Sequence, residues 1–145
     1  MAKKKVCVSF DYDNDRYYYY LLKAWDKSSN FEFYFNDMTP SEINSNSVVT
    51  VKRVLSNKIG EANYMIAIIG KHSDSYHSDY KEIGYKNWQA YEIDKNREKG
   101  NGLVVVFIDA CYSAPSEVYG QGAKFVYSFE QSKILQALND LCSNR

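Results

Sequence analysis

Hydrophobic residues along the chain fall into two alternating kinds of segment. The first kind is a short run rich in branched and aromatic residues, which favours a β-strand. Five such runs are present, at Val6–Phe10, Phe31–Phe35, Tyr64–Ile69, Leu103–Ile108 and Lys124–Tyr127. The third and fourth runs are wholly apolar, which is typical of strands that are buried on both faces of a parallel sheet.

The second kind of segment carries apolar residues at the spacing of one helical face. The stripe from Tyr18 to Trp25 has apolar side chains at positions i, i+3, i+4 and i+7, which predicts an amphipathic helix. Similar patterns predict further helices around Val48–Ile59, over Tyr80–Lys99 and around Ile134–Leu141. Gly100 is expected to end the third of these helices.

Strands and helices therefore alternate along the whole chain, which predicts an α/β fold in a single domain over residues 1–145. We expect a flavodoxin-like, doubly wound, five-stranded parallel sheet in the order 2-1-3-4-5, with helices on both faces. Ligands of such folds bind at the carboxyl ends of the strands, beside the switch between strands 1 and 3. The loops expected at that edge are residues 9–15, 36–47 and 70–80.

Charge and hydropathy exclude two classes of function. Eighteen Lys and Arg residues balance eighteen Asp and Glu residues, whereas a dedicated nucleic-acid binder carries a basic surface. The longest apolar runs are far too short to span a bilayer, so no membrane association is expected. No apolar segment follows the lysines at positions 3–5, and we therefore expect no secretory signal and a cytoplasmic location.

Cysteines and histidines give little sign of metal or thiol chemistry. Cys7, Cys111 and Cys142 are too widely spaced for a disulfide framework or a metal-binding pair. His72 and His77 lack the spacing of a zinc motif, so we expect no metal site. Cys111 follows the fourth predicted strand, but no base can be named that would activate it as a nucleophile.

An acidic segment follows the first predicted strand and contains Asp11, Asp13 and Asp15. It is either a polar pocket for ribose hydroxyls or a metal, or the start of a helix. In the second case the acidic residues interact favourably with the helix dipole, and Asn14 or Asp15 caps the helix. Neither a GxGxxG nor a GxxxxGK[ST] motif occurs, so binding of the Rossmann or P-loop type lacks its fingerprint. The third strand ends in Ile69-Gly70-Lys71, without the phosphoacceptor aspartate of a response-regulator receiver.

The third predicted helix carries Trp88 and Glu92, which share one face because they are four residues apart. A carboxylate beside large aromatic side chains can hold sugar hydroxyls and stabilise a cationic transition state. The other interpretation is a solvated helical glutamate next to a tryptophan of the core.

Taken in order, these motifs resemble a TIR domain, over nearly the whole chain. Val8-Ser9-Phe10 is similar to the first TIR box, and Phe35–Pro40 is similar to the loop that follows strand 2 in the family. The order Trp88-x-x-Tyr91-Glu92-Ile93 most resembles the TIR-like subunits of the Thoeris antiphage systems of bacteria. Two features depart from the TIR pattern: Ser41 stands where a glycine usually follows the proline, and the segment 73–87 is longer than usual.

The resemblance implies that the protein cleaves the bond between nicotinamide and ribose in NAD+, which is a substrate and not a cofactor. It implies that Glu92 is catalytic and that the substrate-binding residues are Ser9, Phe10, Asp11, Asp37 and Trp88. It further implies a cyclic ADP-ribose-type messenger that activates a separate effector protein, a phage-derived activator, and self-association. Two alternatives remain: a TIR-type interaction module without catalysis, and a nucleoside deoxyribosyltransferase-like enzyme with a covalent glutamate nucleophile.

Overall fold

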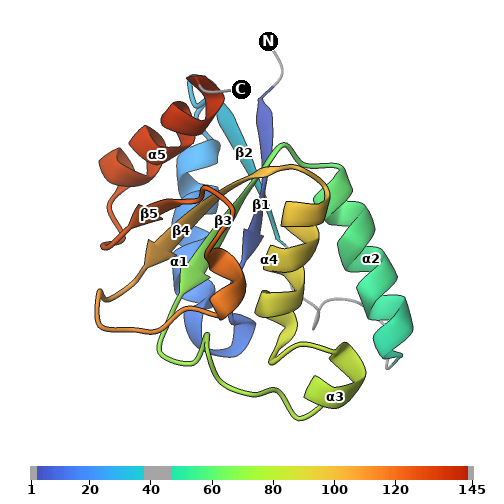
Figure 1. The fold of residues 1–145 in the computed structure, drawn as a ribbon. Helices are drawn as coiled ribbons and strands as arrows, with labels where there is room; N and C mark the ends of the chain where they lie inside the picture. Colours follow the sequence, from blue (N-terminus) through green and yellow to red (C-terminus); the bar gives the residue numbers. More distant parts are fainter. Residues whose placement is uncertain (1–2, 38–46, 144–145) are drawn as a thin grey trace.

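The computed structural model describes residues 3–37 and 47–143, which form five strands, five α-helices and a short 3-10 helix (Figure 1). The strands are β1 Lys4–Ser9, β2 Phe33–Asp37, β3 Tyr64–Ile69, β4 Gly102–Phe107 and β5 Lys124–Val126. The helices are α1 Tyr12–Asp26, α2 Val48–Gly60, α3 Tyr80–Ile83, α4 Trp88–Glu98, the 3-10 helix η2 Ser116–Val118, and α5 Gln131–Ser143.

The five strands form one parallel sheet in the order β2-β1-β3-β4-β5, as predicted. The chain moves from β1 outward to β2, and then crosses back to place β3 on the other side of β1. In the register of this central pair, Val6 lies opposite Tyr64 and Ser9 lies opposite Ala67. The carboxyl ends of β1 and β3 therefore form the switch point at which such folds bind ligands.

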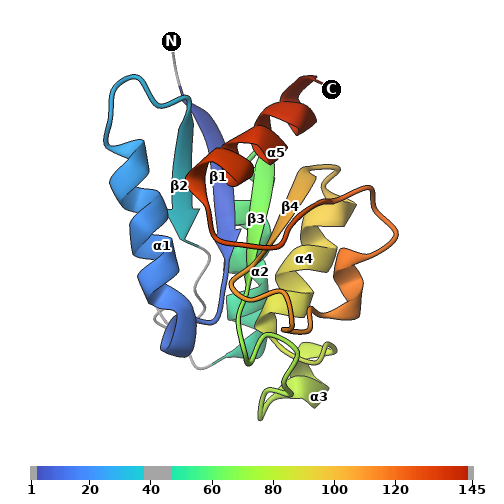
Figure 2. The same cartoon turned by 90° about the vertical axis from the view of Figure 1, so that its left-hand side faces the viewer.

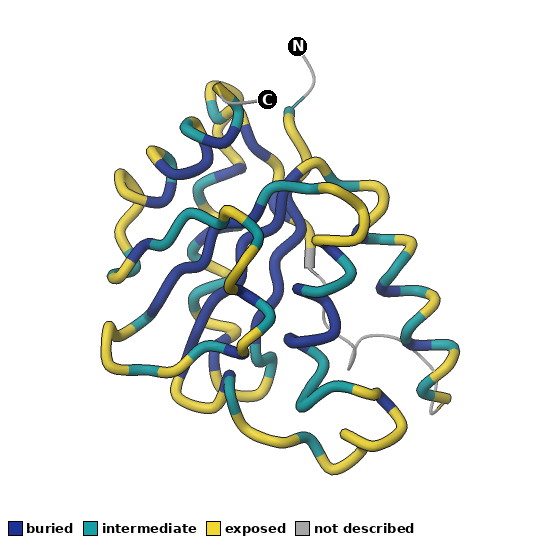
Figure 3. Tube along the Cα trace, in the orientation of Figure 1, coloured by how far each residue is buried: buried dark blue, intermediate teal, exposed yellow. Residues whose placement is uncertain are grey.

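Alternate residues of each strand pack into two separate hydrophobic layers, one on each face of the sheet. Val6 and Val8 belong to the layer beneath α1 and α5, whereas Cys7 belongs to the layer beneath α2 and α4. Figures 1 and 2 show these two helix pairs on opposite faces, and Figure 3 shows the sheet as the most deeply buried part of the chain. The covering of both faces explains why the central strands are almost continuously apolar.

The prediction of one helix over residues 80–99 is wrong, because two shorter helices occupy this segment. Gly84 ends α3 with a φ of 82°, in the left-handed region that favours glycine. The side chain of Asn87 then begins α4 by accepting a hydrogen bond from the backbone N–H of Ala90 at 2.8 Å. Hydrophobic periodicity gave no warning of this break, whereas the glycine and the asparagine are ordinary stop and start signals.

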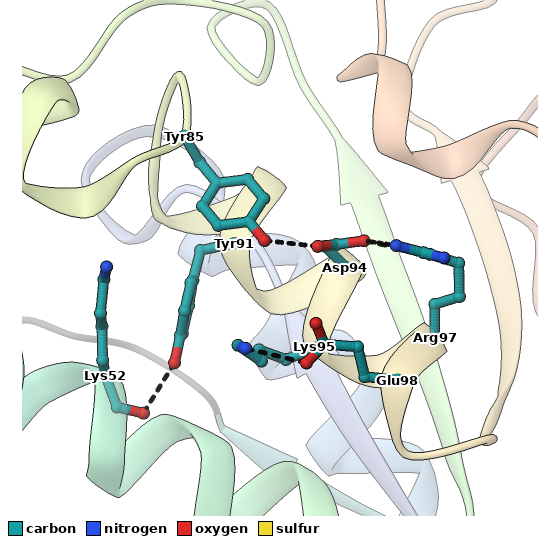
Figure 4. A network of polar contacts seen from close by, with 7 residues as sticks. All are labelled: Lys52, Tyr85, Tyr91, Asp94, Lys95, Arg97 and Glu98. Carbon is teal, nitrogen blue, oxygen red and sulfur yellow. Dashed lines mark hydrogen bonds and ion pairs between the residues drawn. The ribbon is translucent and has the colours of Figure 1, made fainter.

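Polar contacts fasten the outer side of α4 to its neighbours (Figure 4). The Tyr91 hydroxyl donates to the Lys52 carbonyl of α2 at 3.0 Å, and Tyr85 and Arg97 both donate to Asp94. Burial raises the pKa of Asp94, but these two donors and nearby positive charges outweigh it, so the pKa lies below its ordinary value. This network holds α4 firmly between α2 and the sheet.

No helix in the part of the chain that the structure describes has the length and apolar character needed to cross a membrane.

Candidate functional site

The candidate site begins where β1 ends, with a contact between Ser9 and Glu92. Ser9 stands two residues after Cys7 and so points to the same face of the sheet, toward α4. Its Oγ donates a hydrogen bond of 2.8 Å to Oε1 of Glu92. Ser9 is 0% exposed and Glu92 only 1% exposed, so the interpretation of Glu92 as a solvated helical residue is wrong. The structure holds a carboxylate in the interior, against the end of the first strand.

Gln89 lies one helical turn before Glu92 and joins the two central strands at their carboxyl ends. Its Nε2 donates to the carbonyl of Ser9 at 3.1 Å and to the carbonyl of Ile68 at 2.8 Å. Sequence reasoning missed this residue, because a glutamine on a helix is usually exposed and no motif distinguishes it. Its position fixes α4 to the switch point of the sheet.

A cavity of about 480 Å³ lies beside this contact, between the starts of α1, α2 and α4 and the loop after β3. Its lining residues are Phe10, Asp11, Tyr12, Asp13, Asn14, Val48, Val51, His72, Ser73, Ser75, Tyr76, His77, Asp79, Asn87, Trp88 and Gln89. Of the predicted substrate-binding residues, Phe10, Asp11 and Trp88 line the cavity. Ser9 and Glu92 do not line it, and lie behind Gln89 in the interior.

One predicted site residue and one predicted motif cannot be placed in this way. Asp37 pairs with Val8 at the end of β2, but its side chain lies outside what the structure describes. The TIR-like motif after β2 continues through Pro40 to Ser41, and these positions lie outside the described residues. Their part in the site stays a prediction.

Two aromatic side chains of the cavity lining, the half-buried Trp88 and the almost completely buried Phe10, are held in place by other rings. Phe10 stacks on Tyr19 with ring centroids 5.1 Å apart and planes inclined by 10°. Trp88 meets His77 edge-on at 6.5 Å and Tyr91 at 5.7 Å. These contacts fix the ring orientations, so the cavity offers preformed surfaces to a planar ligand.

Acidic side chains dominate the charge of the cavity. Asp11, Asp13 and Asp79 line it, while none of its described lining residues is a lysine or arginine. Asp11 also caps α1, because its side chain accepts from the backbone N–H of Asp13 at 3.2 Å. The helix-start interpretation of this segment is therefore confirmed, but the cap is Asp11 and not Asn14 or Asp15, which lie inside the first turn. Asp11 also lines the cavity. Such surroundings favour a cationic ligand group over a phosphate.

Asp15, in the first turn of α1, is a second buried carboxyl group, and its burial was not predicted from the sequence. It is 6% exposed and packs directly against the backbone of Gly70, at the end of β3. Burial, helped by the charge of Asp11 and opposed by His72, raises the pKa of Asp15 to about 6. The close approach of the two residues accounts for a glycine at position 70.

The loop after β3 is fixed to the start of α4 by Asn87. Its Nδ2 donates to the carbonyls of Ser73 and Ser75, at 2.8 and 2.9 Å. The buried Ser73 Oγ accepts from the backbone N–H of Gly70 at 2.9 Å. Ser73 therefore has a structural role in this loop, and both Ser73 and Ser75 belong to the cavity wall.

The described thiols and ligating groups do not favour nucleophilic or metal chemistry. Burial and the charge of Glu92 raise the pKa of the Cys7 thiol far above its ordinary value. A hydrogen bond with Asp109 raises the pKa of the exposed Cys111 thiol. Thiolate is the reactive form, so neither residue is activated. Over residues 3–37 and 47–143, no three side chains of His, Cys, Asp or Glu are grouped so that they could hold a metal ion.

The fold and the site together define a flavodoxin-like α/β domain whose cavity lies at the β1/β3 switch point. Residues 7–112 match the family of TIR-like domains of the Thoeris protein ThsB. The match covers more than half of the chain, and the chain belongs to this family of antiphage TIR-like proteins. No curated protein sequence matches the chain.

Solved structures support the fold class. A 2-deoxyribosyltransferase from Bacillus psychrosaccharolyticus has 12% identity and a TM-score of 0.56, over 89% of this chain and 90% of its own. A 2-deoxyribosyltransferase from Leishmania mexicana has 13% identity and a TM-score of 0.55, over 98% of this chain and 99% of its own. At such low identity these similarities describe the fold and not the activity.

Proposed function

We propose that this protein cleaves the N-glycosidic bond between nicotinamide and ribose in NAD+, with Glu92 as the catalytic carboxylate. The observation that carries the proposal is the buried pair of Ser9 and Glu92 at the switch point, beside a cavity with aromatic and acidic walls. Membership of the ThsB TIR-like family supports the same assignment.

The main contribution that this reaction needs from the protein is electrostatic stabilisation of the positive charge that forms on the ribose. Nicotinamide in NAD+ is already a cationic leaving group, so the bond from C1′ to the ring nitrogen breaks without a general acid. The electron pair leaves with the neutral nicotinamide, and the ribose becomes oxocarbenium-like. A carboxylate facing that positive charge lowers the barrier, and the loss of such a group costs about 10²–10³ in rate.

Glu92 is almost completely buried, so the ribose must displace the Ser9 hydroxyl from Oε1 in order to reach the carboxylate. This exchange needs a rotation about χ1 of Ser9 and, because Gln89 lies between the pair and the cavity, a path past the Gln89 side chain. A ribose hydroxyl then takes the place of the serine as hydrogen-bond donor. Low local dielectric strengthens the interaction between the carboxylate and the developing cation.

The walls of the cavity suit the nicotinamide end of the substrate. Trp88, which is half-buried, offers aromatic surface to a planar cationic ring, an interaction that is favourable over aromatic side chains. Asp11 and Asp13 add negative charge around the same ring.

The fate of the ribosyl cation determines the product. Attack by water at C1′, with loss of a proton to solvent, gives ADP-ribose. Attack by a nucleophile of the same molecule gives a cyclic ADP-ribose-type messenger, which the family resemblance favours. In this proposal the messenger activates a separate effector protein, and a phage-derived signal activates the cyclisation.

The test is chromatography of the products formed from NAD+ by purified protein, with and without lysate from infected cells. We expect wild type to release nicotinamide, and Glu92→Gln to lose at least about 10²-fold in rate. Glu98→Gln is the matched control, because Glu98 is an exposed glutamate on the same helix, paired with Lys95. Equal turnover by Glu92→Gln and wild type would show that the site is wrongly assigned.

The same experiment separates the proposal from its two alternatives. A deoxyribosyltransferase-like enzyme would form a covalent adduct between the sugar and Glu92, detectable by mass spectrometry of protein quenched during turnover. A TIR-type interaction module would neither bind nor cleave NAD+ under any of these conditions.

A further inference from the structure

We propose that Gln89 recognises the leaving group, with its Oε1 accepting a hydrogen bond from the carboxamide N–H of nicotinamide. The inference rests on the proposed function and extends it by naming a residue that selects the substrate. It begins from the orientation of one amide group at the switch point.

Two backbone carbonyls fix that orientation. The carbonyls of Ser9 and Ile68 both accept from Nε2 of Gln89, which uses both of its N–H groups. An amide turned the other way would place its oxygen against two other oxygens. The Gln89 side chain therefore presents Oε1, a pure acceptor, in a defined direction.

Among residues 3–37 and 47–143, no donor reaches this Oε1 atom within hydrogen-bond distance. Gln89 is 5% exposed, and it lines the cavity. A buried acceptor without a donor is unfavourable, and such groups in proteins are few. Oε1 itself has almost no exposed surface, so a ligand donor in the cavity reaches it only when the cavity wall at Gln89 opens slightly. Such a ligand gains the hydrogen bond and removes this penalty.

The residues around Gln89 indicate which ligand group donates a hydrogen bond to its Oε1. Gln89 follows Trp88 directly and binds the carbonyl of the residue before Phe10, so it is linked to both aromatic walls. A nicotinamide ring placed against these walls has one kind of N–H donor, its carboxamide, because the ring nitrogen carries the ribose. The carboxamide N–H of nicotinamide is a donor and Oε1 of Gln89 is an acceptor, so the two groups are complementary.

A second buried amide on α4 provides a matched comparison. Nδ2 of Asn96 likewise donates to two backbone carbonyls, those of Asn101 and Gly102, and Asn96 is 0% exposed. Its Oδ1 also has no donor among the described residues. Asn96 does not line the described cavity. It therefore makes the same kind of contacts with two backbone carbonyls as Gln89, but a ligand in the cavity does not reach it.

The experiment compares NAD+ with its 3-acetylpyridine analogue, in which a methyl group replaces the carboxamide NH₂. Dissociation constants come from calorimetry and kcat/KM from product release. We expect wild type to prefer NAD+ by about ten- to 100-fold in both quantities. Gln89→Met loses donor and acceptor. Gln89→Lys keeps donors for the two carbonyls, loses the acceptor and adds a positive charge, which acts alike on both cationic compounds. Both variants should reduce the preference to about threefold or less.

The preference is the ratio of two values measured on the same protein. If part of a variant is unfolded, both values change by the same factor and the preference stays the same. Asn96→Met removes the comparable amide and should keep the wild-type preference even if its Tm falls. Equal affinity of wild type for the two compounds, or an unchanged preference in Gln89→Lys, would overturn the role of Gln89 while leaving NAD+ cleavage intact. If wild type neither binds nor cleaves NAD+, the proposed function fails and the inference fails with it.

Discussion

The backbone of Gly70 lies directly against the carboxylate of Asp15, so closely that a Cβ atom at position 70 would overlap with it. The contact joins the end of β3 to the first turn of α1, at the edge of the cavity. It places a buried carboxyl group, with a pKa of about 6, where two elements of the site meet.

This contact predicts a strong coupling between the two positions. Gly70→Ala should destabilise the wild-type protein by about 1–3 kcal/mol, because the new methyl group displaces the carboxylate. In an Asp15→Ala background the same substitution should cost clearly less, since the obstructing atoms are gone. Denaturant unfolding of the four proteins measures the coupling, and strictly additive effects would contradict the packing described.

Gly60→Ala is the control for this cycle. Gly60 is the last residue of α2, and a Cβ there would meet only the side chain of Lys99, at 3.7 Å or more. We expect a neutral or slightly stabilising effect, because alanine favours a helix more than glycine does.

The raised pKa of Asp15 predicts a particular pH dependence of stability. Its ordinary value is 3.8 and its value in the folded protein about 6, so the folded state binds more protons between these values. The contribution of Asp15 to stability therefore falls as the pH rises from about 4 to about 6, and stays constant above that. Asp15→Asn should have a Tm a few degrees above wild type at pH 7 and a similar Tm near pH 3.

Thermal unfolding of both proteins over pH 3–8 checks this prediction. Only the difference between the two curves is informative, because other carboxyl groups titrate in the same interval. A difference that is constant over the whole range would show that Asp15 keeps an ordinary pKa.

The hydrogen bond from Ser9 to Glu92 predicts effects on both stability and activity. Ser9→Ala should cost about 1–3 kcal/mol in the free energy of unfolding, because the buried carboxylate loses a donor. In a Glu92→Gln background, Ser9→Ala should lower the free energy of unfolding by less. A neutral amide oxygen that lacks the serine donor is less unfavourable than a carboxylate that lacks it. Release of nicotinamide by Ser9→Ala should also fall, by about tenfold, because the hydroxyl orients the carboxylate in the free protein before the ribose takes its place. Full activity in a folded Ser9→Ala protein would contradict this role.

We expect the hydrogen bond of the Tyr91 hydroxyl to stabilise the packing of α4 on α2. Tyr91→Phe removes the hydrogen bond to the Lys52 carbonyl and should lower the free energy of unfolding by about 1 kcal/mol. Tyr17→Phe serves as the control, because Tyr17 is strongly exposed on α1 and should tolerate the same change with no measurable effect. Equal effects of the two variants would mean that the Tyr91 hydrogen bond makes no net contribution.

The sheet could be predicted from the sequence because burial on both faces leaves continuous apolar runs. The run Tyr64–Ile69 coincides with β3 at both ends, and the strand order followed from the alternation of elements. The break between α3 and α4 was missed because apolar periodicity continues past Gly84, although the local signals at Gly84 and Asn87 were present.

The candidate site was only partly predictable, for a reason that lies in α4. Residues 89–93 are all buried, because the helix is enclosed by the sheet, α2 and η2. A helix enclosed on several sides shows no single apolar stripe, so its polar residues give no sign of where they point. Family resemblance is therefore the basis on which Glu92 is predicted to be catalytic, whereas the contacts of Gln89 and the burial of Asp15 became visible only in the structure.

The longer segment between β3 and α4 is attached to the rest of the protein through the Asn87 side chain and the buried Ser73 hydroxyl. Its middle, around Tyr76, is exposed and still forms part of the cavity wall. Ile83 of the same segment is fully buried in the core, so only the exposed part around Tyr76 is open to redesign without disturbing the packing on the sheet. Grafting other versions of this loop onto the same scaffold would be a direct route to altered ligand preference.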